Sequence, residues 1–525
     1  MVGTSYIPFP PWALFFCYVP LWVYVVEGTP SLRRVFGQGW LAQFVLSLIG
    51  FFWIYHVSRE FGYLPLPLAA LALILFAALV HLHIPVSLVI VHVLRGRWRW
   101  SKGVTYLYLA LSLWALETFW PMIFPWNLAY SLIWARIPAF QLADGIGFEG
   151  LSLLILLSQA GLAYSISLSL GNKEGEGRRQ WRQWLQLPTW VGLLVVALFW
   201  VVLSVTGSWR GELFAKRSYS TLKVGLVQGN VSNSEKVEAE KQGYHVPDMI
   251  QKYFDMSLKL RDLRPDVQLF IWPEAAIPEF LDEHNRYRKH TRLFYDRLPV
   301  LQRPIILGAF SSDPMERFPR RDFNALFAFS KEGLMVSPPY QKTKLLIFGE
   351  YTPLAHVFPI LSKYNPAGSG FSAGVGPQIF LLDGWKIGLQ ICYESLFPSF
   401  SNQVARWRAD MIVNVTNDSW FGPYGEPYQH LYMTLARAIE TRLTLIRVTN
   451  SGFSSVIDGA GRIYTRSPLF EDWSEVVTVR LYHQDQPTFF VRYREIMILM
   501  VMLLILIGLW FLRYLNMRNQ ERVHD

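Results

Sequence analysis

The chain has 525 residues, of which 52% are hydrophobic and only 17% are charged, and it contains 21 Trp and 36 Phe. This composition excludes an ordinary soluble protein of one domain. The apolar excess lies before residue 207 and after residue 494, while the residues between have a globular composition. A net charge of +10 can indicate nucleic-acid binding, but here Lys and Arg gather in short loops beside apolar segments, which indicates orientation in a membrane instead.

Seven apolar segments are each long enough to cross a bilayer. The third contains Pro85 and is longer than a straight crossing needs, so it is either one tilted or kinked helix or two short spans. The predicted spans are Trp12–Val26, Trp40–Val57, Leu66–Leu94, Val104–Trp120, Leu151–Leu170, Trp190–Val205 and Ile496–Leu512.

Positive charge indicates which side of the membrane each loop faces. Loops rich in Arg or Lys follow the first, third, fifth and seventh spans, and the other connections carry few such residues. Cytoplasmic loops carry the excess of positive charge, so all the rich loops are cytoplasmic if seven spans alternate. The globular region between the sixth and seventh spans is therefore expected outside the cytoplasm.

These observations predict four parts of the chain. The predicted parts are a helical membrane domain of about six spans over residues 1–206, a globular domain over 222–488, a transmembrane helix over 495–513 and a cytoplasmic tail over 514–525. Glu117 lies inside the fourth span. A carboxylate at such a position is costly, so it is either a functional group or a structural group satisfied by hydrogen bonds.

The globular region alternates short runs of Val, Ile and Leu with segments of helical periodicity, a pattern typical of a layered α/β fold with a buried sheet. The predicted strands are Leu222–Gln228, Val267–Trp272, Pro304–Phe310, Lys386–Ile391, Met411–Val415 and Thr444–Val448, and the predicted helices are Val246–Leu260 and Tyr428–Arg442.

Four chemically capable groups follow these strands or lie in nearby loops: Glu274, Lys342, Glu350 and Cys392. A carboxylate in a dry pocket can deprotonate a thiol, and a lysine can stabilise the oxyanion that forms when the thiolate attacks a carbonyl. A second carboxylate can hold the lysine and the base in place. Taken singly, however, the cysteine is more typical of a small buried hydrophobe, and each Glu or Lys is more typical of a surface charge.

Several motifs occur in a characteristic order around these groups. They are Val227-Gln228-Gly229-Asn230, Ile271-Trp272-Pro273-Glu274, Tyr340-Gln341-Lys342, Phe348-Gly349-Glu350-Tyr351, Cys392-Tyr393-Glu394 and Asn417-Asp418-Ser419-Trp420-Phe421-Gly422. The set resembles the nitrilase or carbon–nitrogen hydrolase superfamily, and more narrowly the apolipoprotein N-acyltransferase family. The similarity extends into the membrane region through Phe124-Pro125-Trp126 and Gln141-Leu142-Ala143-Asp144.

The resemblance implies a multi-span helical membrane domain joined to a nitrilase-like αββα sandwich. It implies a catalytic triad of Glu274 as general base, Lys342 as oxyanion stabiliser and Cys392 as acylated nucleophile. The supporting and substrate-binding residues that it implies are Glu350, which holds the lysine and the base; Tyr393 and Glu394, which shape the pocket; Trp420 and Phe421, near the lipid entrance; and Val237, where the family usually has Trp.

Members of that family move an acyl chain from a phospholipid to the amine of a diacylglyceryl-cysteine at a lipoprotein N-terminus, through a cysteine thioester. The resemblance implies these two partners, the final step of bacterial lipoprotein maturation, and an inner-membrane enzyme with a periplasmic catalytic domain. It implies no metal, no other cofactor and no nucleic acid. Two other interpretations stay open: a membrane-tethered amidase or nitrilase that hydrolyses a small amide, and a non-enzymatic envelope protein that uses the fold for binding.

Overall fold

The computed structural model describes residues 7–170, 186–232, 235–236, 238, 245–314, 321–347, 349–352, 357 and 370–524. The chain divides into two compact units. The helical unit comprises Met1–Phe52, Ala70–Glu212 and Tyr493–Asp525, and the sandwich unit comprises Trp53–Ala69 and Leu213–Arg492.

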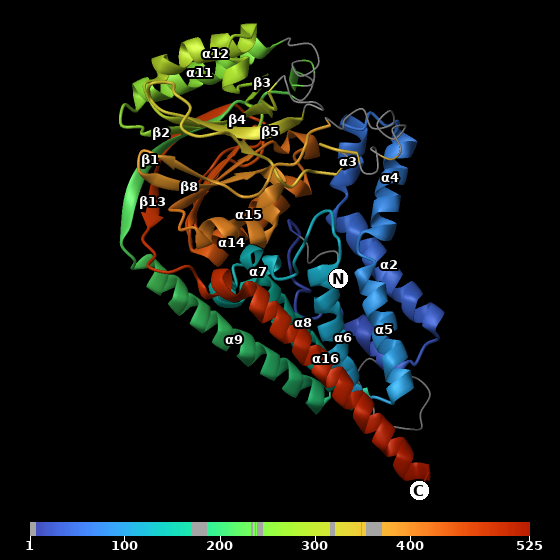
Figure 1. Ribbon diagram of the computed structural model, residues 1–525. Helices are drawn as coiled ribbons and strands as arrows, with labels where there is room; N and C mark the ends of the chain where they lie inside the picture. Colours follow the sequence, from blue (N-terminus) through green and yellow to red (C-terminus); the bar gives the residue numbers. More distant parts are fainter. Residues whose placement is uncertain are drawn as a thin grey trace. The chain divides into compact units, whose positions relative to one another are not determined.

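Apolar helices make up the helical unit (Figure 1). The predicted third span consists of two helices separated by residues 80–82, and Gly147, with a φ of +70°, interrupts the regular conformation of α8. Helix α9 continues past residue 206, and α16 includes the predicted tail. The helices are α1 (Val19–Glu27), α2 (Leu32–Gly50), α4 (Leu66–Leu79), α5 (His83–Trp98), α6 (Lys102–Phe119), α7 (Tyr130–Trp134), η2 (Pro138–Leu142), α8 (Ala143–Leu170), α9 (Leu187–Ala215) and α16 (Phe489–His524).

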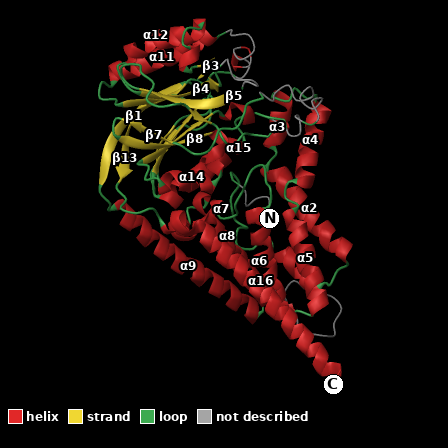
Figure 2. Cartoon of the chain, viewed as in Figure 1, coloured by secondary structure: helices red, strands yellow, loops and turns green. Residues whose placement is uncertain are grey.

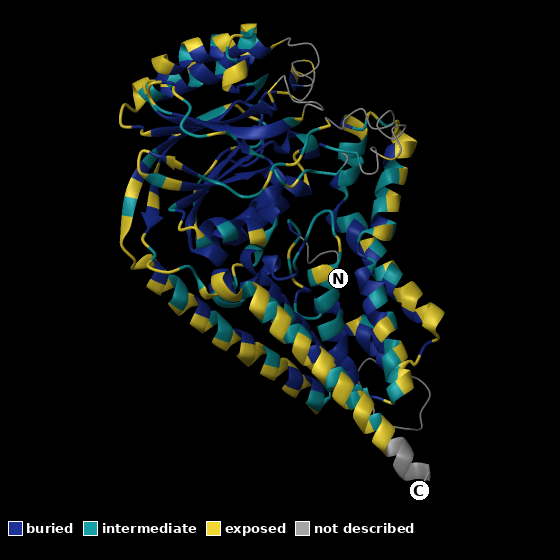
Figure 3. Ribbon diagram, in the orientation of Figure 1, coloured by how far each residue is buried: buried dark blue, intermediate teal, exposed yellow. Residues whose placement is uncertain are grey.

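Several helices have the length and composition of membrane spans. Four such segments lie in the described part of the chain: Leu66–Trp98, Pro138–Leu170, Leu187–Ala215 and Phe489–Arg518. The successive helices Leu32–Gly50 and Trp53–Glu60 together make a possible fifth. Most side chains on α9 and α16 are exposed or half-buried (Figure 3). Apolar surface of this extent is rare on soluble monomers and is typical of helices that face lipid.

The first sheet of the sandwich unit has seven strands, in the order β13-β1-β2-β4-β5-β6, with β3 paired to β4. Strands β1, β2 and β4 are parallel neighbours, whereas β13 and β5 run antiparallel at either side of them. The strands are β1 (Tyr219–Gln228), β2 (Leu269–Ile271), β3 (Ile277–Phe280), β4 (Ile305–Ser312), β5 (Asp322–Phe329), β6 (Tyr340–Gln341) and β13 (Trp473–Tyr482).

The second sheet has six strands, in the order β12-β11-β10-β9-β8-β7. Its central strands β8, β9 and β10 are parallel, and every residue of β9 and β10 is buried, as expected for parallel strands covered on both faces. The strands are β7 (Ile379–Leu382), β8 (Trp385–Ile391), β9 (Met411–Thr416), β10 (Thr444–Thr449), β11 (Ser455–Ile457) and β12 (Ile463–Arg466).

Helices cover the outer faces of both sheets, so the layers run helix, sheet, sheet, helix (Figures 1 and 2). Helix α11 (Val246–Leu263) buries an apolar stripe against Trp272 and the first sheet, together with α12 (Lys289–Leu301). Helices α14 (Pro398–Arg406) and α15 (Gly425–Thr441) pack on the second sheet. The predicted αββα sandwich is confirmed. Short elements complete the unit: α3 (Trp53–Glu60), η4 (Glu283–Asn285), η5 (Cys392–Leu396) and η6 (Asp418–Phe421).

The backbone of strand β4 packs closely against the segment that carries Glu274. A Cβ on Gly308 would lie 2.6 Å from the Cα of Glu274, and also 2.6 Å from the N of Ala275 and the O of Pro273. The Gly308 N–H donates to that same Pro273 carbonyl at 3.1 Å. These contacts are with backbone atoms, which cannot rotate aside as a side chain could. Glycine at 308 therefore permits the close approach that fixes the segment after β2.

Gly308→Ala should lower the free energy of unfolding by about 1–3 kcal/mol, the usual cost of inserting a methyl group into a packed core. Denaturant unfolding of the detergent-solubilised protein measures this. The matched control is Gly161→Ala, because a Cβ at that helical position meets no atom within 4 Å. Equal stabilities for the wild type and Gly308→Ala would show that the strand can shift without cost.

Candidate active site

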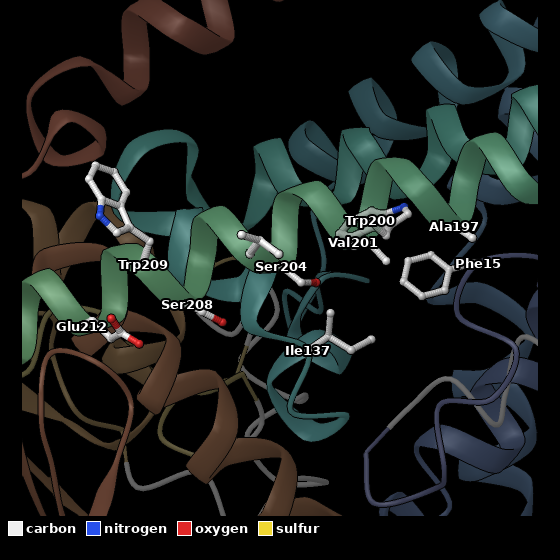
Figure 4. A pocket seen from close by; sticks show the side chains of 10 residues that line it. Phe15, Ile137, Ala197, Trp200, Val201, Ser204, Ser208, Trp209 and Glu212 are labelled. Atoms are coloured by element: carbon white, nitrogen blue, oxygen red, sulfur yellow. The ribbon is translucent and has the colours of Figure 1, made fainter.

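An open apolar groove of about 550 Å³ runs along α9 (Figure 4). The described residues that line it include several Ser, Trp and aliphatic side chains and one ionisable group, Glu212. This lining has no His, Lys or Cys that would form a nucleophile with its activating base. The described lining therefore offers no thiol, imidazole or amine for such chemistry, whereas groups of these kinds meet in the sandwich unit.

Three charged side chains meet in the interior of the sandwich. The Nζ of Lys342 donates to Oε1 of Glu274 and to Oε1 of Glu350, both at 2.9 Å. All three side chains are buried or nearly so, with exposed fractions of 2%, 7% and 12%. The Nδ2 of Asn324 donates to the same two oxygens, at 2.7 Å and 2.9 Å. The lysine and the asparagine thus hold both carboxylates in fixed positions.

Local structure explains why these side chains converge. Glu274 follows β2 directly after Pro273, and its second oxygen accepts from the backbone N–H of Asn417 at 2.9 Å. Lys342 follows β6, and its own N–H pairs with the carbonyl of Asn324 on β5 at 2.8 Å. The second oxygen of Glu350 accepts from the N–H of Leu346 at 2.9 Å, which closes a turn within its own loop.

Cys392 lies at the start of η5, directly after β8, and is 7% exposed. Its φ of +50° is in the left-handed region that non-glycine residues rarely adopt. Burial, followed by the negative charge of Glu274, raises the pKa of the Cys392 thiol, and the opposing charge of Lys342 only partly offsets them. The structure thus brings the sulfur within the electrostatic reach of both groups, and the resting thiol is neutral at pH 7.

The pKa of Lys342 is raised well above its usual value. Burial alone would lower it, but the charges of Glu274 and Glu350 outweigh burial. The lysine is therefore a permanent cation, and a positive charge held next to the thiol suits oxyanion stabilisation rather than proton transfer.

Glu394 connects the segment after β6 to the end of β8. Its Oε1 accepts from the N–H groups of Thr343 and Lys344, at 2.6 Å and 3.1 Å. Its Oε2 accepts from the Tyr340 hydroxyl at 2.6 Å and from the Ile391 N–H at 2.8 Å. The residues flanking Lys342 and Cys392 are therefore tied to one buried carboxylate. Tyr393, the other predicted pocket residue, is 7% exposed and lies with its ring 5.0 Å from that of Phe397.

A second buried charge network lies beside the nucleophile. Arg447 donates to Oδ2 of Asp418 at 2.7 Å, and Nδ1 of His430 lies 2.9 Å from Oδ1 of the same carboxylate. Burial would raise the pKa of Asp418, but Arg447 and His430 lower it. Asp418, Glu426 and His430 also have the spacing of metal ligands. Asp418 contacts both Arg447 and His430, so these residues form a buried polar network centred on its carboxylate.

Trp420 and Phe421 both lie in η6 and contact α3 and Phe61, the residue that follows α3, within the sandwich unit. The rings of Phe421 and Trp53 meet edge to face at 5.3 Å, and those of Trp420 and Phe61 are 3.8 Å apart. Phe421 is only 3% exposed, while Trp420 is half-buried. The remaining predicted substrate-binding residue, Val237, lies outside the described residues.

Sequence reasoning did not identify Asn324, Tyr340 or His430 as parts of this site. Asn324 lies within the apolar run of β5 and could have been flagged as a polar residue in a buried strand. Asp418 was noticed only as part of a family motif, and His430 was not assigned to the site. Nothing in the local sequence indicates that either lies next to the cysteine, because that contact depends on how α15 packs on the second sheet.

Comparisons with known proteins place this geometry in a family. The carbon-nitrogen hydrolase family model matches residues 223–483, and the model for the N-terminal domain of apolipoprotein N-acyltransferase matches residues 1–161. An apolipoprotein N-acyltransferase of Bdellovibrio bacteriovorus is 43% identical over 500 residues, which are 94% of this chain and 88% of that protein. The chain belongs to the apolipoprotein N-acyltransferase family. This membership confirms the resemblance found in the sequence, and with the apolar helices it identifies a membrane protein.

Other members of this family match the chain with lower identity. The apolipoprotein N-acyltransferase of Geobacter metallireducens is 32% identical over 71% of this chain and 67% of that protein. That of Azotobacter vinelandii is 30% identical over 88% of this chain and 84% of that protein. Among solved structures, Saccharomyces cerevisiae Nit3, a member of branch 10 of the nitrilase superfamily, aligns with a TM-score of 0.36 and 19% identity over 51% of this chain and 91% of that one.

Asn324→Asp should destabilise the protein by about 1–3 kcal/mol, because a third carboxyl group would replace a donor that two carboxylates share. In the folded protein, the neighbouring carboxylates would raise the pKa of the introduced carboxyl above its value in the unfolded chain. The full loss of stability is therefore expected at pH values above that raised pKa. It should fade as pH falls towards the unfolded value near 4, where the protonated group can donate again. Unfolding midpoints between pH 4.5 and 8 measure the effect.

The double variant Asn324→Asp/Glu350→Gln provides the control, because it restores both the number of carboxylates and one amide donor. It should recover most of the stability lost at pH 8. If the single variant is as stable as the wild type at pH 8, the two hydrogen bonds of Asn324 do not contribute to holding the carboxylates.

Proposed function

We propose that this chain transfers an acyl group from a phospholipid to the N-terminal amine of a diacylglyceryl-cysteine lipoprotein, through a thioester on Cys392. The observation that carries the proposal is the buried Lys342 between Glu274 and Glu350, with the thiol within reach of both charges. This arrangement supplies a base, a fixed cation and a nucleophile for attack on an ester. Family membership over almost the whole chain supports the choice of substrates.

In the first half-reaction, Glu274 accepts the proton of the Cys392 thiol while the sulfur attacks an ester carbonyl of the phospholipid. Lys342 stabilises the negative charge that develops on the carbonyl oxygen. When the tetrahedral intermediate collapses, the ester C–O bond breaks and Glu274 returns the proton to the leaving alkoxide. The products are the thioester and a lysophospholipid.

In the second half-reaction, the amine of the lipoprotein attacks the thioester carbonyl. Glu274 accepts a proton from the amine, Lys342 again stabilises the oxyanion, and the C–S bond breaks to leave an amide. The proton on Glu274 then returns to the sulfur. Glu350 holds the lysine throughout, so that the cation keeps a counter-charge when the base is protonated. Tyr393 and Glu394 support the pocket wall and the backbone around the nucleophile.

Intact-mass analysis of the purified protein with phospholipid tests this function. One acyl group should add to the wild type and to Cys17→Ser, but none to Cys392→Ser, because an alcohol is activated poorly by a carboxylate base. Adding a diacylglyceryl-cysteine peptide should remove the adduct and acylate the peptide. Rapid release of free fatty acid without peptide would instead show a hydrolase, and an unchanged mass of the wild type would exclude the thioester.

We further infer that the protein resides in the bacterial inner membrane with its sandwich domain in the periplasm. Loops rich in Arg and Lys support this orientation, since they follow alternate spans of the predicted seven. In this assignment, residues 1–206 and 495–513 cross the membrane, residues 222–488 are periplasmic, and residues 514–525 are cytoplasmic. A periplasmic site also suits substrates that reach the outer leaflet.

Cysteine labelling in intact spheroplasts should report opposite sides for the two ends of this assignment. In a Cys17→Ser/Cys392→Ser background, Tyr287→Cys should react with a membrane-impermeant maleimide, because Tyr287 is 87% exposed. Gln520→Cys should react only after the membrane is opened. Equal reactivity of both positions before opening would overturn the orientation.

A further inference from the structure

The nucleophile is held in a strained backbone conformation by hydrogen bonds to its own carbonyl. A non-glycine residue with φ near +50°, as at Cys392, costs about 1–3 kcal/mol and persists only where the surroundings enforce it. Three groups can donate to the Cys392 carbonyl oxygen: Nε2 of His430 at 3.3 Å, Nδ2 of Asn414 at 3.4 Å and Oγ of Ser395 at 3.0 Å. Ser395 belongs to the same turn, whereas the other two come from α15 and β9.

His430 has hydrogen-bond acceptors at both of its ring nitrogens. Its Nδ1 faces carboxylate oxygens, 2.9 Å from Asp418 and 3.4 Å from Glu426. Its Nε2 faces the carbonyl of Cys392 at 3.3 Å, which can only accept, and the hydroxyl oxygen of Ser395 at 3.4 Å, whose own proton is placed to donate to the same carbonyl. A neutral imidazole has a single N–H, so both contacts are made together only by the imidazolium form. His430 and both carboxylates are buried.

Asp418 is linked to the Cys392 carbonyl by two routes. One passes through His430. The other passes through Arg447, which donates to Asp418 and, at 2.7 Å, to Oδ1 of Asn414. The amide of Asn414 then points its donor at the carbonyl. Each route ends on the same oxygen. A network built only for packing would not need to converge on the backbone of the nucleophile.

We propose that His430 is a positioning residue for acyl transfer: its Nε2–H anchors the Cys392 carbonyl and so holds the sulfur in line with Glu274 and Lys342. It touches no reacting atom. The inference rests on the proposed function, because it assumes that Cys392 becomes acylated. It adds that the rate of acylation depends on a contact with the backbone carbonyl of Cys392 and not with its thiol.

Two conservative substitutions separate this role from a general structural one. The amide nitrogen of Gln can take the place of Nε2, and that of Asn the place of Nδ1. His430→Gln therefore keeps a donor for the Cys392 carbonyl and gives up the contact with Asp418, whereas His430→Asn does the reverse. Single-turnover acylation of Cys392 by phospholipid, followed by intact mass, is measured for both variants together with their thermal unfolding.

His430→Asn should acylate about 10–100-fold more slowly than the wild type, as expected for a slightly misplaced nucleophile. His430→Gln should stay within a few-fold of the wild type, and the phospholipid concentration at half-maximal rate should change in neither variant. Equal rates for the two variants, or faster acylation by His430→Asn, would overturn the proposal even if both unfold at lower temperature. An absence of the adduct in the wild type would instead refute the thioester, which keeps the two failures distinct.

Discussion

The buried ammonium of Lys342 between two carboxylates is the interaction on which the rest of the site depends. Removing one partner of a buried ion pair typically costs about 3–5 kcal/mol, because a charge is left without compensation. This triple therefore needs a scaffold that brings its groups together before substrate arrives. The scaffold consists of the segments that follow β2 and β6, the turn that Glu350 closes, and Asn324 on β5.

The two sheets contribute different catalytic groups, and Glu394 holds these groups in fixed positions relative to one another. The first sheet supplies the base and the lysine, whereas the nucleophile follows β8 of the second sheet. Backbone N–H groups from both sides converge on the Glu394 carboxylate. Any shift of one sheet relative to the other would break some of these hydrogen bonds. The Glu394 carboxylate therefore helps to keep the distance between the Cys392 thiol and Lys342 constant.

The sequence predicted those features that depend on local pattern. Glu274 and Cys392 follow apolar runs that end abruptly, and a buried strand with a polar residue at its end is visible in the residues themselves. Asn324 and His430 could not be assigned, because their partners are set by strand register and by helix packing, and lie up to 50 residues away in the sequence. The first predicted span, Trp12–Val26, is helical only from Val19, since hydropathy reports apolar character and not where backbone hydrogen bonds begin.

Burial of the nucleophile also bears on the choice between an amine and water as the acyl acceptor. A thiol whose pKa is raised by burial and by Glu274 is not reactive until a substrate carbonyl and the base act together. A thioester formed in the same place has little contact with solvent, since Cys392 and Tyr393 are each 7% exposed. Excluding water slows hydrolysis of such an intermediate. An acceptor amine that is delivered to the site can then compete with water, because the αββα core buries the sulfur to which the acyl group is attached.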